Sequence, residues 1–136
     1  MKIGITCNPT YGGSGAVAIH DTARNQGLDL VHVHYAIPHA TSAWIAEEMV
    51  PPERDLKIST TLHGTDIALV GLHPSFQAIT QFSVLKSHGL TDVSKFLKDR
   101  TVEDFNLPAE RIRVIPDVVE IFAGIQAEVP ARLVFV

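Results

Sequence analysis

The feature that most constrains this chain is a regular alternation of short apolar segments with longer segments of helical periodicity. We expect strands at 2–7, 30–35, 57–62, 89–93, 113–115 and 132–136, and helices at 14–26, 41–49, 75–87, 95–105 and 118–127. Short strands that are mostly apolar are typical of a parallel sheet buried on both faces. The alternation therefore predicts an α/β fold, a doubly wound and mostly parallel sheet of about six strands with helices on both faces.

Several residues mark where these helices begin and end. Ser14 and Ser94 stand where an N-capping hydroxyl is favoured, at the start of the first and fourth helices. Gly27 and Asn106 follow the same two helices, and both residue types end helices readily. The boundaries therefore support the element assignment.

Length and charge narrow the class of protein. A chain of 136 residues suits one domain, which we expect to span 1–136. The net charge is −4 and the basic residues are scattered, so we expect no nucleic-acid partner. No apolar run reaches the ~18 residues of a membrane span, and the N-terminus lacks a signal-peptide pattern. Cys7 is the only cysteine, which excludes an internal disulfide. We expect a cytoplasmic protein with no membrane contact.

Polar segments follow four of the predicted strands at the points where they end. These segments read NPTYGGSG, HYAIPHA, HGTD and DVS in chain order. The carboxyl ends of parallel strands lie at one edge of a sheet, and ligands of such sheets bind there. The sequence therefore predicts a ligand site at this edge.

The first of these segments contains a glycine-rich motif. Residues 13–18 read GSGAVA and fit the pattern G-x-G-x-x-A of a Rossmann-like phosphate loop, with Gly13, Ser14 and Gly15 nearest an anion. The alternative is a plain strand-to-helix turn. A nicotinamide dinucleotide also needs an acidic residue at the end of the second strand, where the chain has His34 and Tyr35. This weakens the interpretation as a NAD-dependent oxidoreductase, which stays open as an alternative.

The HGTD segment supplies a second set of candidates. His63 could donate a hydrogen bond to a sugar hydroxyl or a phosphate, Thr65 offers a hydroxyl, and Asp66 could orient a partner. The alternative is a helix cap or turn made by Thr65 or Asp66.

Histidines at the end of the second strand raise the question of a metal. His32 and His34 share one strand face and His39 follows, so with His63 they offer imidazoles to zinc. Strand histidines are more often hydrogen-bonded groups in a core or lining a site. We favour that interpretation and predict no metal. Tyr35 could offer its hydroxyl to a ligand.

Together these segments resemble a known family. MKIGITCNPTYGGSG, LVHVHYAIPHATSAWIA, TTLHGTDIALVG, PSFQAITQFSVLKSHGLTDVS and IRVIP are similar to the acceptor-side domain of retaining GT-B glycosyltransferases of the family 4 type. The resemblance is closest to the branch that serves bacillithiol biosynthesis. It implies transfer of N-acetylglucosamine from UDP-N-acetylglucosamine to L-malate, with the UDP-sugar as donor and no metal or other cofactor.

The same resemblance assigns roles to individual residues. It implies that Gly13, Ser14 and Gly15 lie near the donor phosphates and the acceptor. It implies that Tyr35 and Thr61 bind malate, and that His63 acts catalytically beside the transferred sugar. Thr65 and Asp66, from the HGTD segment, complete the predicted substrate-binding set.

The chain also departs from the family. The resemblance covers 1–116 with a break in order after Ala18, and 117–136 is similar to a helix and strand of the donor-binding domain. Gln81 stands where the family usually has an arginine suited to a malate carboxylate. We therefore expect weak or no activity from this chain alone. A non-catalytic nucleotide- or anion-binding module or scaffold remains an alternative, and a homodimer through the cleft face or a sheet edge is possible.

Overall fold

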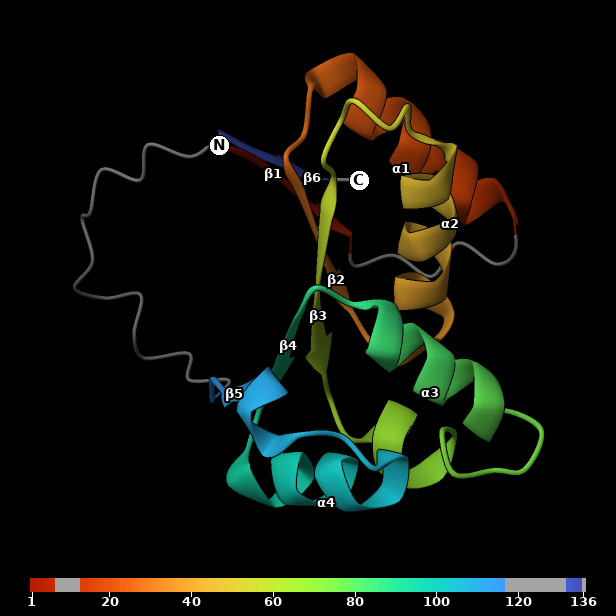
Figure 1. Cartoon of the computed structure of the whole chain (residues 1–136), viewed down its shortest axis with the longest axis vertical. Coiled ribbons are helices and arrows are strands. Elements are labelled where there is room, and N and C mark those ends of the chain that lie inside the picture. Colours follow the sequence, from red (N-terminus) through yellow and green to blue (C-terminus); the bar gives the residue numbers. More distant parts are fainter. Residues whose placement is uncertain (7–12, 117–131, 136) are drawn as a thin grey trace.

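The computed structural model describes residues 1–6, 13–116 and 132–135. Its centre is a six-stranded sheet in the order β5-β4-β3-β2-β1-β6, in which every pair of neighbours is parallel (Figure 1). The strands are β1 (Lys2–Thr6), β2 (Leu30–His34), β3 (Lys57–Leu62), β4 (Gly89–Asp92), β5 (Ile112–Val114) and β6 (Arg132–Phe135). This confirms the predicted α/β fold with a parallel, Rossmann-like sheet.

Helices connect the first five strands. The α-helices are α1 (Gly13–Gln26), α2 (Thr41–Met49), α3 (Gln77–Lys86) and α4 (Lys95–Phe105). Three short helical turns, η1 (Ala36–Ala40), η2 (Thr65–Leu69) and η3 (Ala109–Arg111), complete the connections. The predicted helix at 118–127 lies outside the described residues. None of the described helices combines the length and apolar character needed to cross a bilayer.

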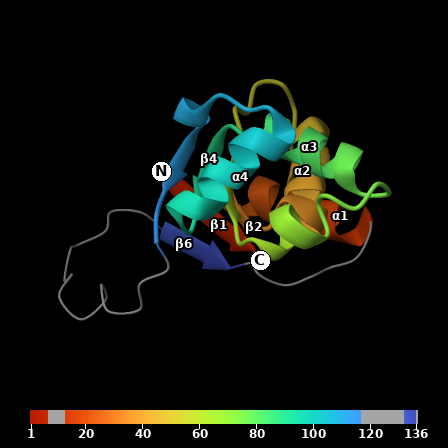
Figure 2. The same ribbon diagram turned by 90° about the horizontal axis from the view of Figure 1, so that it is seen from below.

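The four α-helices lie together on one side of the sheet (Figures 1 and 2). Strands β1 to β5 follow one another in sequence order across the sheet. Parallel crossovers are right-handed, so a run of strands that always steps in one direction places every connecting helix on the same face. Helices on both faces were predicted, and within the described residues the second face has none.

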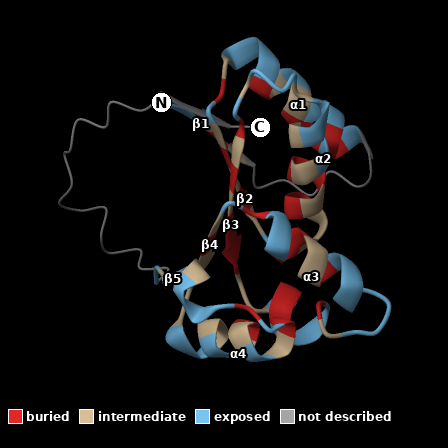
Figure 3. Cartoon of the chain, in the orientation of Figure 1, coloured by how far each residue is buried: buried red, intermediate tan, exposed pale blue. Residues whose placement is uncertain are grey.

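The core fills the space between this helix layer and the sheet (Figure 3). One cluster joins α1 and α2 to β2 and includes Val31, Val33 and Ile58. A second joins η2, α3 and α4 to the other end of the sheet and includes Leu62 and Phe105. Since Ile58 and Leu62 both belong to β3, this strand links the two clusters.

Most of the predicted helix boundaries are confirmed. The Ser94 hydroxyl accepts a hydrogen bond from the Leu97 amide at 3.2 Å and caps α4. Gly27 and Asn106, which follow α1 and α4, have the left-handed φ angles of +64° and +51°. Ser14 differs from its prediction, because α1 begins one residue earlier and Ser14 lies inside the first turn.

Candidate functional site

The carboxyl ends of β2 and β3 bring three predicted site residues into contact. The Nδ1 atom of His34 lies 2.7 Å from the Nε2 atom of His63, within hydrogen-bond distance. The ring of Tyr35 lies beside His63, with the ring centroids 5.0 Å apart. The prediction that polar segments after successive strands meet at one edge of the sheet is confirmed for these two strands.

A chain of hydroxyl contacts extends this group into the sheet. Thr61 Oγ1 lies 3.1 Å from His32 Nε2 and 2.7 Å from Thr91 Oγ1. The His32 and His34 rings meet edge to face at 5.1 Å. Thr61 is only 8% exposed, so its hydroxyl is largely engaged by the chain's own neighbours. Thr91 belongs to this group although it was not among the predicted site residues.

Asp66 fastens the two loops that carry these side chains. It is buried, with only 3% of its surface exposed. One carboxylate oxygen accepts a hydrogen bond from the Ala36 amide at 2.8 Å, and the other from the His63 amide at 3.1 Å. The carboxylate therefore holds the loop after β2 against the loop after β3. A role of Asp66 in binding substrate stays a prediction.

Tyr35 adopts a backbone conformation that is unusual for a residue with a side chain. Its φ angle is +73°, and such conformations cost on the order of 1–3 kcal/mol. Its amide donates to the Thr61 carbonyl at 2.9 Å, which ties the turn to β3. His39, nearly buried, lies with Nδ1 2.7 Å from the His34 carbonyl oxygen. Because a carbonyl only accepts, His39 carries a proton on Nδ1.

The remaining predicted residues occupy the starts of two helices. Gly13, Ser14 and Gly15 form the beginning of α1, with Ser14 exposed and Gly15 buried. Thr65 is exposed and is the first residue of η2. Helix N-termini present backbone amides that suit an anion, which is compatible with the predicted roles without testing them.

Metal binding was the alternative interpretation of the histidine cluster. Across the residues that the structure describes, no group of three or more His, Cys, Asp and Glu side chains is placed to hold a metal ion. Burial lowers the pKa of His32, and the neighbouring His34 and His63 lower it further. His32 is therefore a neutral, hydrogen-bonded group near pH 7.

Asp92 is a buried carboxylate that the sequence analysis did not single out. It ends β4 beside Leu62, is fully buried, and has no hydrogen-bond partner within range among the described residues. Burial, with a smaller contribution from nearby Asp66, raises its pKa to about 6 against the opposing effects of Thr101 and Lys98. The sequence signal that could have identified Asp92 is an acidic residue within an otherwise mostly apolar strand.

Gln81, where the resemblance implied an arginine in the family, makes a structural contact. Its Nε2 atom donates to the Phe105 carbonyl at 3.3 Å and so joins α3 to the end of α4.

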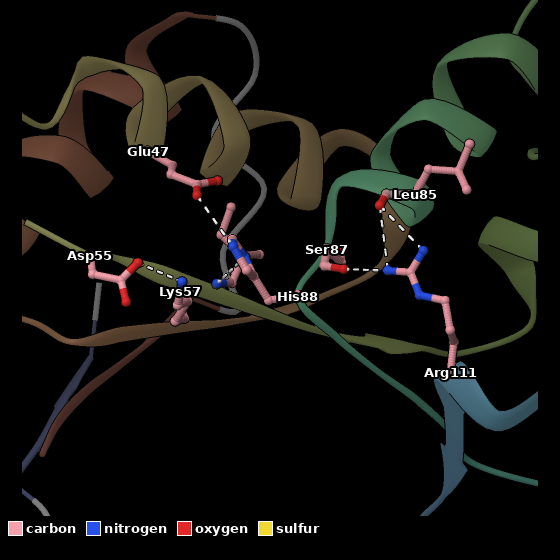
Figure 4. Close-up of polar contacts among 8 residues, drawn as sticks. Glu47, Asp55, Lys57, Leu85, Ser87, His88 and Arg111 are labelled. Atoms are coloured by element: carbon pink, nitrogen blue, oxygen red, sulfur yellow. Dashed lines mark hydrogen bonds and ion pairs between the residues drawn. The ribbon is translucent and has the colours of Figure 1, made fainter. Parts of the chain in front are cut away.

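Other polar contacts lie away from this site (Figure 4). The Arg111 guanidinium donates to the Leu85 and Ser87 carbonyls at the end of α3, at 3.4 and 2.8 Å. His88, just before β4, lies 3.6 Å from a Glu47 oxygen. A hollow of about 570 Å³ opens near the amino ends of the strands, and no predicted site residue lines it. These features lie outside the candidate site.

Comparison with known protein families matches residues 4–121 to the family described as Glycosyltransferase Family 4. The match covers most of the chain. The chain belongs to glycosyltransferase family 4. One relative is the N-acetyl-alpha-D-glucosaminyl L-malate synthase of Bacillus anthracis, 43% identical over 95 residues. That alignment covers 70% of this chain and 24% of the relative, so the chain spans about a quarter of the relative's length. The resemblance inferred from the sequence motifs is confirmed.

Proposed function

We propose that this chain is the acceptor-side part of a retaining glycosyltransferase that moves N-acetylglucosamine from UDP-N-acetylglucosamine to the hydroxyl of L-malate. The observation that carries the proposal is the group formed by His63, Tyr35 and Thr61 at the carboxyl edge of the sheet, in a chain of this family. The name of the Bacillus anthracis relative supports the choice of sugar and acceptor.

In this proposal the malate hydroxyl attacks the anomeric carbon on the face from which UDP departs. The bond from that carbon to the diphosphate oxygen breaks, and the hydroxyl proton passes to the departing diphosphate. His63 hydrogen-bonds the transferred sugar and the Tyr35 hydroxyl binds the acceptor, while Thr61 borders the acceptor site and its hydroxyl contacts His32 and Thr91. The amides of Gly13, Ser14 and Gly15 stabilise the charge on the departing diphosphate. No metal is needed, because hydrogen-bond donors and basic groups neutralise the leaving group.

We expect little turnover from this chain alone. The alignment covers only 24% of the relative, and the resemblance places the donor-binding groups in its second domain. A non-catalytic nucleotide- or anion-binding module is the second candidate, favoured by the same partial coverage of the relative. If the chain forms a homodimer, the second copy would have to supply the side of the substrate cleft that this chain lacks.

Calorimetric titration with UDP-N-acetylglucosamine, UDP, L-malate and NAD separates these proposals. We expect saturable binding of UDP-N-acetylglucosamine and of L-malate and none of NAD. His63→Ala should weaken binding of UDP-N-acetylglucosamine and not of UDP, which lacks the transferred sugar. His73→Ala is the matched control, since His73 is an exposed histidine that contacts Phe76 instead.

Coupled measurement of UDP release and of mass in solution completes the test. UDP binding without UDP release would favour the non-catalytic module. Saturable NAD binding with no response to UDP compounds would contradict the proposal.

A further inference from the structure

One of the shortest polar contacts at the site joins two imidazole rings. His34 Nδ1 and His63 Nε2 are 2.7 Å apart, and the ring planes are tilted by 36° with centroids at 5.0 Å. A direct hydrogen bond between two ring nitrogens requires that one carries a hydrogen and the other does not. The protonation states of the two histidines are therefore linked by geometry.

We propose that His34 is a positioning residue that holds His63 in one ring orientation and one tautomer, and that the two histidines share a single proton. The inference deepens the proposed function, since it concerns the residue assigned to the transferred sugar. His34 itself acts through His63.

Counting hydrogens shows why the pair takes one proton and resists a second. With both rings neutral, one bonding nitrogen donates and the other accepts. Adding one proton keeps the bond and makes it charge-assisted, which strengthens it. Adding a second proton places hydrogens on both bonding nitrogens, so the bond breaks and two like charges face each other.

Neighbouring residues on both sides of the pair restrict its geometry. On β2, the His32 ring packs edge to face on His34. On the His63 side, Tyr35 packs on the ring and Asp66 anchors the backbone amide. His39 is fixed on the His34 carbonyl.

The charged group beside the pair is Asp66, whose carboxylate is tied to His63 through the backbone amide. Burial, and then the neighbouring His34 and His63, lower the pKa of His32, so His32 stays neutral beside the pair. Thr61 and Thr91, which continue the contacts from His32, are neutral.

Nitrogen-15 NMR of the imidazoles, recorded on the full chain without ligand between pH 5 and 8.5, tests the inference. We expect His34 and His63 to titrate together in one step, with a second step at lower pH. The neutral His63 ring should show the shifts of a single tautomer. Independent single-site titrations of the two histidines would overturn the inference.

Substitution of His34 separates positioning from proton sharing. His34→Phe should convert His63 to one independent titration with mixed tautomers. His34→Asn keeps a group able to hydrogen-bond near the Nδ1 position, so His63 should retain one tautomer while the joint titration disappears. His73→Phe is the control and should leave the His63 spectrum unchanged.

Amide spectra report whether each variant is folded. If His34→Phe does not fold, the wild-type titration and the His34→Asn variant still decide the question. Unchanged nitrogen-15 shifts of His63 in folded His34→Phe would contradict a positioning role.

Titration with UDP-N-acetylglucosamine distinguishes this inference from the proposed function. His34→Phe should weaken binding of UDP-N-acetylglucosamine roughly fivefold, about the size of one hydrogen bond, and His34→Asn should weaken it less. Binding of UDP, which lacks the sugar that His63 contacts, should not change. A wild-type chain that binds neither UDP-N-acetylglucosamine nor L-malate would contradict the proposed function, while the ligand-free titrations would still decide the role of His34.

Discussion

At the scale of single residues, the structure separates side chains that face the candidate site from those that build it. The sequence pattern correctly predicted that His63 and Tyr35 lie at one edge of the sheet, because the carboxyl ends of parallel strands share an edge. It could not foresee that Asp66 turns inward to two backbone amides. Which donor a carboxylate meets depends on the three-dimensional approach of loops 30 residues apart, and no local pattern encodes that approach.

Asp92 gives the clearest prediction at this scale. Asp92→Asn should raise the free energy of unfolding at pH 7 by about 2–3 kcal/mol, because a buried carboxylate whose pKa is raised to about 6 must otherwise be charged. Asp99→Asn is the control. Asp99 is an exposed residue of α4 paired with Lys95, and its substitution should change stability by less than about 0.5 kcal/mol.

The contribution of Asp92 to stability should change with pH in a definite direction. Between the unfolded pKa of 3.8 and the folded value of about 6, folded Asp92 retains a proton that the unfolded chain has lost. Its contribution to stability therefore falls as the pH rises through that range. Urea unfolding from pH 4 to 8 should show the advantage of Asp92→Asn growing up to about pH 6 and then levelling. An advantage independent of pH would contradict the assignment.

At the scale of elements, helix starts test how far local sequence decides structure. Ser94 has the predicted cap, whereas α3 begins at Gln77 and not at 75, with Phe76 preceding it and no side-chain cap. Ser94→Ala should therefore destabilise the fold by about 1 kcal/mol. Ser75→Ala, the control, should be nearly neutral. Thermal unfolding followed by circular dichroism measures both, and equal losses would show that the α4 cap contributes nothing specific.

The turn after η2 carries a second prediction at this scale. A Cβ atom on Gly71 would lie 2.0 Å from the Asp66 carbonyl oxygen, so Gly71→Ala must displace the turn that carries the Asp66 carboxylate. Overpacking of this kind costs on the order of 1–3 kcal/mol. We also expect altered nitrogen-15 shifts of His63, whose amide Asp66 holds.

Gly89→Ala is the matched control for this turn, since its added Cβ would meet Ser59 at an ordinary 3.5 Å. Urea unfolding and imidazole NMR on both variants provide the measurements. A Gly71→Ala protein as stable as Gly89→Ala, with an unchanged His63 signal, would show that the turn adapts freely.

At the scale of the whole molecule, alternation of strands and helices predicted the fold class and the parallel sheet. It did not predict the placement of the helices. The strand order β5-β4-β3-β2-β1-β6 decides that placement through the handedness of crossovers. Order is set by which strands pair, a property of contacts distant in sequence, so the helix layer on one face could not be read from local periodicity.

The predicted single domain is tested by asking whether the two core clusters unfold together. Trp44, the only tryptophan, packs against the first cluster, and Phe105 is buried in the second. Because β3 contributes Ile58 to one cluster and Leu62 to the other, we expect one cooperative unit. Phe105→Leu should lower the free energy of unfolding by about 1–1.5 kcal/mol. The unfolding midpoint measured by Trp44 fluorescence and the one measured by far-ultraviolet circular dichroism should shift by the same amount.

Ile58→Val is the matching change in the first cluster and should shift both signals together, by about 0.5–1.5 kcal/mol. Two separate units would behave differently. Phe105→Leu would then move part of the circular dichroism transition and leave the fluorescence midpoint where it was. Such a split would show that β3 transmits no cooperativity between its two ends, and that the chain consists of two folding units within one continuous sheet.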